Sequence, residues 1–322
     1  MKILVTGSEG SLMQSVIPKL IEDNHSVIGV DNFSRYGEIS RNRNYEFIKG
    51  DLTDIDFVNK IMPGVDYVIQ GAAIIYGVMG FHAYPADILS KDVILHQNIL
   101  WSALKNKVRK VIYISSSMVY ERAEEVPSSE LNVDEMKIPL TDYGLSKLVG
   151  ERLSKAFSTQ YGLEYTIWRP FNIITPYERA EKEPGFSHVF ADFIDRIIIK
   201  KETPMRIIGD GNQIRCFTWI DDVSNAIAKF SFIEKSNNKT YNIGNPEPIK
   251  MIDLAKKIHQ YAMSKGVVEK GNLNFSHIEA PKDDVMIRIP SIEKIQSEFN
   301  WSPKINLAQA LEICIDEALR QN

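Results

Sequence analysis

Tyr143 and Lys147 are the pair whose residue types and spacing point most directly to acid–base chemistry. They lie four positions apart in a segment with helical periodicity, 143–161, so both side chains would project from one face about one turn apart. A phenol has a pKa near ~10 when it is unperturbed. A neighbouring ammonium stabilises the phenolate and lowers that pKa, which would give a base that works near neutral pH.

The surroundings decide whether this pair is functional, because a Tyr and a Lys at this spacing occur by chance in most proteins. Three serines, Ser115, Ser116 and Ser117, directly follow a predicted strand at 110–114. The strand itself has no need of a polar triplet at its carboxyl end. A serine hydroxyl close to the phenol could share the proton and hold a substrate oxygen.

The first fourteen residues, MKILVTGSEGSLMQ, predict an element that would bring a cofactor to these groups. An apolar run breaks off at Gly7 and a helical pattern begins soon after, as in the first unit of a dinucleotide-binding sheet. Gly7 can adopt the turn that leaves the strand, and Gly10 lets the backbone approach a pyrophosphate at the helix N-terminus. A third glycine is expected where Met13 stands, so an ordinary βα turn is the alternative interpretation.

Asp31, after the predicted strand 26–30, favours NAD as the cofactor. An acidic side chain about 20 residues beyond the glycines suits the adenosine ribose hydroxyls and would repel a 2′-phosphate. Arg35 lies close enough to accept such a phosphate, and Asp31 could instead be a turn residue before Asn32. With a nicotinamide in place, Tyr143 could take a hydroxyl proton while hydride leaves the same carbon.

Alternating strands and helices predict an α/β fold, a Rossmann-type doubly wound parallel sheet, with a smaller and mainly helical C-terminal part. Asp51 and Leu52 could lie beside the adenine, although capping of the next helix explains this stretch equally well. Ala72 and Ala73 are small residues at a strand end, where open α/β sheets bind ligands. The glycine- and aromatic-rich stretch 76–84 is expected to be a loop beside a substrate pocket. The predicted strands are 3–5, 26–30, 45–48, 66–69, 110–114, 165–168, 205–208, 215–219 and 240–243, and the main predicted helices are 87–106, 143–161 and 187–200.

Bulk composition describes an ordinary globular protein. The chain has 322 residues, of which 44% are hydrophobic and 25% charged. A net charge of -4 gives no reason to expect nucleic acid as a partner. Two cysteines make neither a disulfide framework nor a zinc-ligand spacing, and we expect no metal. No apolar run is long enough to span a membrane and no leader precedes the first strand, so we expect a cytoplasmic protein.

The chain resembles the extended short-chain dehydrogenases/reductases of the nucleotide-sugar epimerase/dehydratase family. The matching motifs run nearly from end to end, and they are far more specific for family and fold than for reaction. They lie at 6–10, 31–32, 50–54, 71–73, 115–120, 143–147, 169–172, 209–211, 215, 221–222, 241–244 and 288–290.

The resemblance implies NAD as cofactor, a nucleotide-diphosphate sugar as substrate, and specific residues for each task. Tyr143 would be the base, with Ser116 as the catalytic serine and Lys147 holding both the nicotinamide ribose and the phenolate. The implied cofactor-binding residues are Gly7, Gly10, Ser11, Leu12, Asp31, Asn32, Asp51, Leu52, Ala72, Ala73, Tyr143 and Lys147. The implied substrate-binding residues are Ser117, Met118, Asn172, His188, Val189, Arg215 and Arg288.

The resemblance also implies how the chain is divided and assembled. We expect a cofactor domain at 1–172 with a returning segment at about 215–245, and a nucleotide-sugar domain at 173–214 and 246–322. In this family two helices equivalent to 87–106 and 143–161 pair two subunits, so a homodimer is expected. Apolar residues expected beyond the face that the sheet covers are Leu95, Leu100, Leu148 and Phe157.

Met118 separates the reactions of this family. Its 4,6-dehydratases and uronate decarboxylases carry a glutamate at this position, and the dehydratases often have an aspartate where this chain has Ser117. A methionine cannot move the C5 proton, so both chemistries lose their acid/base group. Oxidation at C4, reorientation and hydride return remain, which predicts a C4 epimerase of a nucleotide-diphosphate hexose, with a UDP-hexose as the first guess.

Other functions stay open. The segments 77–80 and 84–87 resemble GDP-sugar enzymes such as GDP-mannose 3,5-epimerases, for which Tyr76, His82 or Glu121 could serve as extra acid/base groups. A 4-ketoreductase would need only the three catalytic residues, but it would usually use NADPH. A 4,6- or 5,6-dehydratase is a further alternative. A cofactor-binding regulator on the same fold is the non-enzymatic alternative, although such proteins usually lose the tyrosine.

Overall fold

A seven-stranded parallel sheet forms the centre of the computed structural model, which describes residues 1–35, 37–38, 41–131, 133, 137–282 and 284–320. Its strands are β1 (Lys2–Thr6), β2 (Ser26–Asp31), β3 (Glu46–Lys49), β4 (Tyr67–Gln70), β5 (Lys110–Ile114), β6 (Glu164–Pro170) and β11 (Lys239–Ile243). Their order in space is β11-β6-β5-β4-β1-β2-β3. The order reverses between β1 and β4, so the crevice at their carboxyl ends is where such sheets bind ligands.

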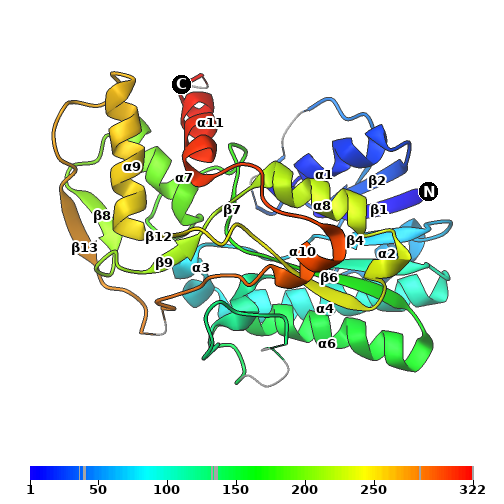
Figure 1. Ribbon diagram of the computed structural model, residues 1–322. Coiled ribbons are helices and arrows are strands. Elements are labelled where there is room, and N and C mark those ends of the chain that lie inside the picture. The colour runs from blue at the N-terminus through cyan, green and yellow to red at the C-terminus, as the bar shows by residue number, and fades with distance from the viewer. Residues whose placement is uncertain (36, 39–40, 132, 134–136, 283, 321–322) are drawn as a thin grey trace.

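Helices cover both faces of this sheet (Figure 1). Alternation along β1 explains the two layers, because Ile3 and Val5 belong to one apolar core and Leu4 to the other. One face is covered by α1 (Ser11–Glu22) and α8 (Ile220–Phe230), and the other by α2 (Ile55–Ile61), α4 (Pro85–Lys105) and α6 (Asp142–Tyr161).

The helix that carries Tyr143 has clear start and stop signals. The Thr141 side chain accepts a hydrogen bond from the Gly144 backbone N–H at 3.0 Å, which caps the first turn of α6. Gly162, with φ of 73°, ends the helix in the left-handed conformation that glycine adopts without strain. The first turn of α6 is thereby fixed at the carboxyl edge of the sheet.

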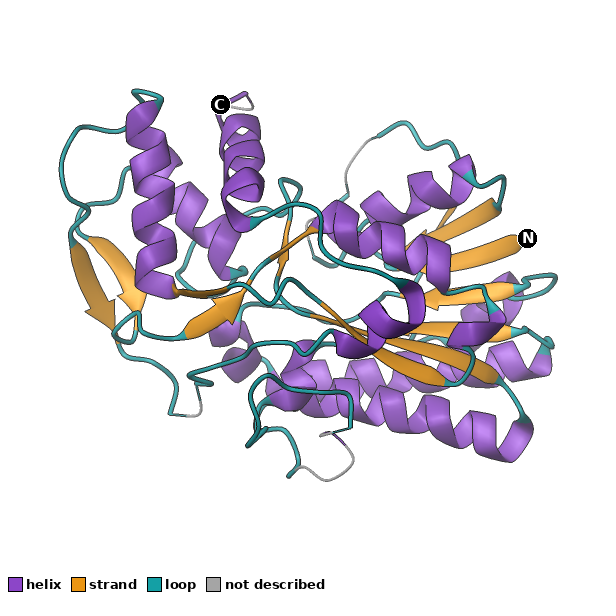
Figure 2. Cartoon of the chain, viewed as in Figure 1, coloured by secondary structure: helices purple, strands orange, loops and turns teal. Residues whose placement is uncertain are grey.

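The C-terminal part of the chain builds a second, smaller body with its own core (Figure 2). Three two-stranded pairs, β7 with β10, β9 with β12 and β8 with β13, accompany its helices. The strands are β7 (Ile173–Ile174), β8 (Met205–Ile208), β9 (Ile214–Cys216), β10 (Thr218–Trp219), β12 (Pro248–Lys250) and β13 (Phe275–Ile278). The helices are α7 (Val189–Ile194), α9 (Met251–Ser264) and α11 (Leu307–Arg320), and α10 (Glu293–Phe299) packs on β11. Shorter helical segments are α3 (Val78–Ala83), η1 (Ser117–Tyr120), η2 (Asp195–Ile199) and η3 (Glu234–Ser236).

The predicted fold class is confirmed, two local predictions are wrong, and one predicted helix is present but wound differently over its second half. The expected loop 76–84 contains α3, whose Gly80 lies against the Tyr76 ring where a Cβ would not fit. The helix expected at 187–200 begins as α7 and widens into the π-helical turn η2 at Asp195. The strand expected at 215–219 is two strands, β9 and β10, which pair with different partners on either side of Phe217.

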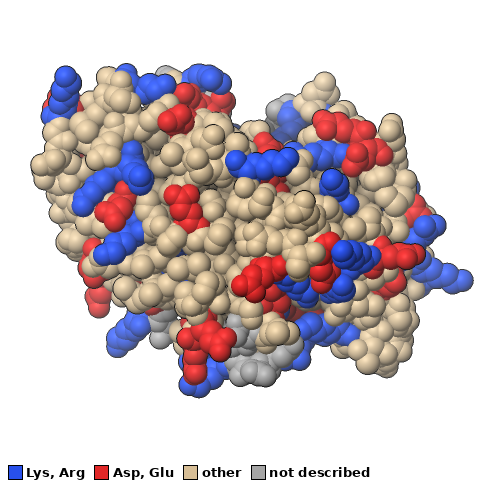
Figure 3. Space-filling view, in the orientation of Figure 1, with Lys and Arg blue, Asp and Glu red and all other residues tan. Residues whose placement is uncertain are grey.

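The surface carries both charge signs, and lysine and arginine lie interspersed with aspartate and glutamate on the face shown in Figure 3. Within the described ranges, no helix combines the length and apolar character needed to cross a bilayer. Among these same residues, no three His, Cys, Asp or Glu side chains are grouped so that they could hold a metal ion.

Candidate active site

A cavity of about 620 Å³ opens at the carboxyl edge of the central sheet and extends to the C-terminal body. Its walls include the glycine loop after β1, the ends of β2, β4 and β5, the first turn of α6, the loop that leads to α7, and β8. Every residue that we predicted to bind cofactor or substrate or to act in catalysis lines this one cavity. Their individual roles remain predictions.

The glycine loop has the shape that a pyrophosphate needs. Gly7 has φ of +66°, and a Cβ on it would lie 2.8 Å from the Ala72 backbone nitrogen. The Thr6 hydroxyl oxygen accepts hydrogen bonds from the Gly71 and Ala72 N–H groups, both at 3.2 Å, which fastens the two strand ends together. Gly10 precedes α1 without a side chain to cap it. The first amides of α1 therefore face the cavity where a dinucleotide phosphate fits.

The Asp31 carboxylate is fixed by the backbone at the end of β2. Its Oδ2 accepts the Glu9 N–H at 3.0 Å and its Oδ1 accepts the Phe33 N–H at 2.8 Å. Arg35 is directed to the far side of the cavity, where it pairs with Glu181 at 3.4 Å. The geometry therefore suits the ribose interpretation of Asp31.

For the stretch after β3, helix capping by Asp54 is confirmed, while contact of Asp51 and Leu52 with adenine stays a prediction. Asp51 and Leu52 line the cavity. The Asp51 carboxylate also accepts the Thr53 N–H and hydroxyl at 2.9 Å, and Asp54 caps α2 through the Asp56 N–H at 2.9 Å.

Met13 lies in the core between α1 and the sheet. Its side chain is 2% exposed, and a Cβ on Gly71 would lie 3.0 Å from its Cγ and Sδ. Met13 thus stands at the position expected for a glycine and is accommodated by a glycine after β4, where it packs in the core and also forms part of the cavity wall.

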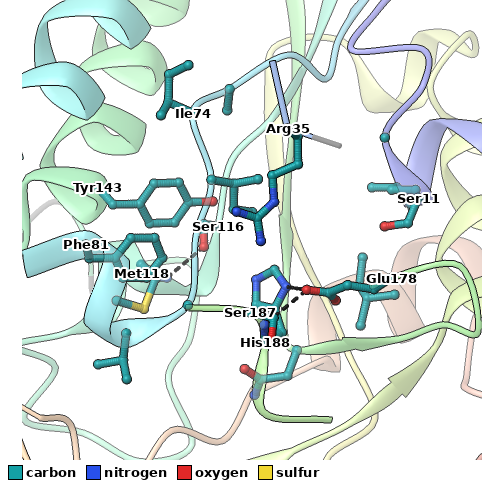
Figure 4. A pocket seen from close by; sticks show the side chains of 18 of the residues that line it. Ser11, Arg35, Ile74, Phe81, Ser116, Met118, Tyr143, Glu178, Ser187 and His188 are labelled. Carbon is teal, nitrogen blue, oxygen red and sulfur yellow. Dashed lines mark hydrogen bonds and ion pairs between the residues drawn. The ribbon is translucent and has the colours of Figure 1, made fainter. Parts of the chain in front are cut away.

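Ser116 and Tyr143 lie side by side at one end of the cavity (Figure 4), and Lys147, one turn further along α6, lines the same cavity. The Ser116 side chain is a hydrogen-bond partner of Tyr143 and accepts the Met118 N–H at 3.1 Å. Lys147 Nζ lies 5.7 Å from the Tyr143 ring centroid and donates to the Ile114 carbonyl oxygen at 3.1 Å. The serine and the tyrosine are placed to act on a single substrate oxygen.

The expectation that a neighbouring ammonium lowers the pKa of Tyr143 is wrong for the chain without bound cofactor. Burial and the Asp92 carboxylate raise the pKa of Tyr143, and the Ser116 hydrogen bond only partly offsets this rise. Burial lowers the pKa of Lys147, while Asp92 and Glu151 raise it. In the chain alone, the Lys147 ammonium therefore does not bring the pKa of Tyr143 below its usual value.

Two residues that support Tyr143 and Lys147 were missed from the sequence. The Phe81 ring stacks on Tyr143, with centroids 4.4 Å apart and planes within 5°. The fully buried Asp92 accepts the Ile74 N–H at 2.8 Å and the Ser146 hydroxyl at 3.0 Å. Asp92 could have been found as an acidic residue on the apolar face of a helix, whereas no spacing signals Phe81.

A buried ion pair holds β5, α6 and β6 together behind the catalytic residues. Arg169 Nη2 lies 2.6 Å from Glu151 Oε2 and Arg169 Nε lies 2.8 Å from Glu151 Oε1. The Ser115 hydroxyl donates to the same carboxylate at 2.5 Å. All three serines line the cavity, and Ser115 also joins this frame through its hydroxyl.

Two arginines line the substrate end of the cavity. Arg288 Nη2 donates to the Asn172 Oδ1 at 3.2 Å and Nη1 contacts the Met118 Sδ, while its buried Nε finds no acceptor among the described residues. Burial, with the nearby Arg215, lowers the pKa of Arg288 to about 9. Arg215 pairs with Asp284 at 3.2 Å. An anion such as a diphosphate would supply the acceptor that Arg288 lacks.

His188 and Glu178 form a further pair at this end of the cavity. His188 Nδ1 lies 2.7 Å from Glu178 Oε1, across the cavity from Tyr143 (Figure 4). Enclosure lowers the pKa of His188, but the Glu178 carboxylate outweighs this effect, so the pKa is raised overall. His188 immediately precedes α7, whose first residue is Val189. Nothing in the spacing of ten residues signalled Glu178.

Two of the residues considered as extra acid/base groups, Glu121 and Tyr76, contact neighbouring side chains of the protein. Both oxygens of Glu121 accept hydrogen bonds from Thr141, from its N–H at 2.7 Å and its hydroxyl at 2.6 Å. The Tyr76 ring lies between Tyr84, at 5.0 Å, and the Arg35 guanidinium, at 5.0 Å. His82 lines the cavity.

Comparison with known proteins identifies the family to which this chain is similar. Residues 3–244 match the model of the NAD dependent epimerase/dehydratase family. The chain is 31% identical over 315 residues to a putative UDP-glucose 4-epimerase of Methanocaldococcus jannaschii, with 96% of each chain covered. It is 25% identical over 322 residues to GDP-mannose 3,5-epimerase of Arabidopsis thaliana, covering 97% of this chain and 81% of that protein. The crystal structure of UDP-glucose 4-epimerase from Thermotoga maritima with UDP-glucose superposes with a TM-score of 0.84 at 28% identity, covering 100% and 99% of the two chains.

Proposed function

Because this chain belongs to the NAD dependent epimerase/dehydratase family, we propose that it inverts C4 of a nucleotide-diphosphate hexose, with a UDP-hexose as the first substrate to test. Its cofactor is NAD, which when bound supplies the acceptor and donor of hydride for the sugar carbon. The UDP-sugar relatives described above support the choice of substrate.

The observation that carries the choice of reaction is the position of Met118. Its backbone N–H is bonded to Ser116, and its thioether lies in the cavity wall beside Arg288. A thioether neither gives nor takes a proton at neutral pH. Ser116 and Tyr143, hydrogen-bonded to each other beside Met118, suit chemistry at one carbinol carbon, whereas the nearby Glu121 carboxylate is held by Thr141.

Each residue has a proposed task in that reaction. Tyr143 takes the proton of the C4 hydroxyl and later returns it, Ser116 holds the oxygen, and Lys147 holds the nicotinamide ribose and orients the phenol. The residues that would hold the cofactor are Gly7, Gly10, Ser11, Leu12, Asp31, Asn32, Asp51, Leu52, Ala72 and Ala73. Those that would hold the substrate are Ser117, Met118, Asn172, His188, Val189, Arg215 and Arg288.

We also propose a division of labour between the two bodies. Residues 1–172 with the returning segment at about 215–245 bind the cofactor, and residues 173–214 and 246–322 bind the nucleotide sugar. The pairing of β11 with β6 in the central sheet supports the return of the chain to the cofactor body.

The His188–Glu178 pair favours one second candidate, a GDP-mannose 3,5-epimerase type of reaction. An imidazole whose pKa is raised by a carboxylate can exchange a proton with a carbon next to a keto group. The similarity of this chain to GDP-mannose 3,5-epimerase of Arabidopsis thaliana also supports this candidate. Deuterium incorporation from solvent separates the two reactions.

The direct test is to incubate the protein with UDP-, GDP-, CDP- and dTDP-hexoses without added nicotinamide and to identify the products by NMR. We expect a C4 epimer from one of these substrates, and NAD as the nucleotide released when the protein is denatured. Loss of water from the sugar, or turnover only with added NADPH, would contradict the proposal.

A further inference from the structure

Glu9 lies in the glycine loop, and three side chains of the β2–β3 segment bind its carboxylate. The residue is 5% exposed. Arg43 binds both carboxylate oxygens, with Nε 3.0 Å from Oε1 and Nη2 3.2 Å from Oε2. Arg41 Nε lies 3.1 Å from Oε2, and the Tyr45 hydroxyl donates to Oε1 at 3.0 Å. The segment between β2 and β3 thus supplies two arginines to one buried carboxylate.

This carboxylate lies beside Asp31, at the end of the cavity that we assign to the adenosine ribose. The Glu9 N–H donates to the Asp31 Oδ2 at 3.0 Å. Burial raises the pKa of Asp31, and the nearby Glu9 carboxylate adds to that rise. The Arg43 guanidinium is held further by the Phe47 ring, whose centroid lies 4.3 Å away. Glu9 and Asp31 therefore present two carboxyl groups on one side of the ribose site.

Arginine is the side chain best suited to bind a phosphate, because its planar fork can donate two hydrogen bonds at once. Arg41 and Arg43 lie between β2, whose end carries Asp31, and β3. Here their guanidinium groups are directed to Glu9 instead.

We propose that Glu9 is a second determinant of cofactor selectivity, which excludes NADP by occupying Arg41 and Arg43 and by adding a negative charge beside Asp31. The inference rests on the proposed function only in assigning this end of the cavity to the adenosine ribose. A purely structural role of Glu9 would affect the binding of NAD and NADP equally, whereas a selectivity role changes their ratio.

The test is the ratio of the dissociation constants for NADP and NAD, measured by titration calorimetry on the full chain after removal of retained nucleotide. Glu9→Ala should lower this ratio by ~10-fold or more, because the released guanidinium groups gain charge-assisted bonds to the 2′-phosphate. The double variant Glu9→Ala/Arg43→Ala should restore most of the preference for NAD. Tyr45→Phe, which removes one bond but keeps the carboxylate, should leave the ratio within about twofold.

An unchanged ratio in Glu9→Ala, with both affinities reduced alike, would overturn this inference and leave the proposed function intact. If Glu9→Ala does not fold, Glu9→Gln is measured in the same way, since it keeps the shape and removes the charge. A parent protein that itself prefers NADP would contradict the cofactor assignment of the proposed function, so the two failures are distinguishable.

Discussion

The Tyr143 hydroxyl is the atom on which the proposed chemistry depends. Burial and Asp92 raise the pKa of Tyr143 in the chain alone, and a positive charge bound close by would lower it again.

Replacing Tyr143 by phenylalanine removes only that hydroxyl and keeps the stacking on Phe81. We expect turnover to fall by roughly 10² or more, the usual scale for a lost acid/base group, while the protein remains folded. Steady-state kinetics and the melting temperature check this expectation. Tyr76→Phe is the matched control and should retain activity within a few-fold, so equal losses in both variants would mean that Tyr143 is not the base.

The His188–Glu178 pair makes a prediction about pH. Because Glu178 raises the pKa of His188, the pairing stabilises the folded protein fully below the unfolded pKa of ~6.5, and this contribution is lost as pH rises through the folded value. An NMR titration of the imidazole should therefore show a pKa above 6.5. In Glu178→Gln the pKa of His188 should fall, while the signal of His259 in α9 stays unchanged. A His188 pKa that is the same in parent and variant would contradict the pairing.

At the scale of elements, Met13 fills the space between α1 and the sheet, at the position where the dinucleotide-binding motif has its third glycine. Met13→Ala should lower the free energy of unfolding by roughly 2–5 kcal/mol, because it leaves a cavity beside Gly71. Urea denaturation measures the change. Met286→Ala, at a methionine that is 50% exposed, is the control and should change it by less than about 0.5 kcal/mol. Equal stabilities of parent and Met13→Ala would show that Met13 does not fill that space.

The elements that could be predicted are those with long apolar runs or capped helical patterns. β1 and β5 belong to this group because their apolar runs are buried along almost their whole length, and α6 because its buried residues recur at helical spacing. The strands β7 and β12 could not be foreseen, because two or three residues leave no periodic signal, and β13 was missed because no apolar run marks it.

In the candidate site too, some residues could be predicted from the sequence and others could not. Motif residues such as Gly7, Asp31 and Tyr143 could be placed because their chemistry requires those types at those spacings. Glu178 and Phe81 act through contacts between segments far apart in the chain, and only tertiary packing brings them to the cavity.

At the scale of the whole molecule, the surface of α4 and α6 bears on assembly. Leu95, Leu100 and Phe157 are buried against the sheet, so the expectation that they lie beyond its reach is wrong, and Leu148 is half-buried. The exposed apolar side chains of these helices are instead Ile94, Trp101 and Tyr161.

We predict a homodimer that buries this surface, with Trp101 near its centre. Trp101 packs edge-to-face on Phe157, with ring centroids 4.7 Å apart, and its centroid lies 5.6 Å from that of Tyr161, so it offers a rigid aromatic anchor. Light scattering at micromolar concentration should give a dimer for the parent and a monomer for Trp101→Glu. Ile313→Glu, at a similarly exposed position on α11, should stay dimeric. A monomeric parent would contradict the prediction.

The central claim is that the chemistry is confined to C4, and the fate of carbon-bound hydrogen tests it most directly. The enzyme is incubated in D₂O with the nucleotide-diphosphate hexose that it converts, and the sugar ring is followed by NMR. Because the hydrogen removed from C4 returns to C4, the account predicts a C4 epimer that contains no deuterium. Deuterium at C3 or C5 would contradict it and would point to proton exchange by His188 beside a keto group.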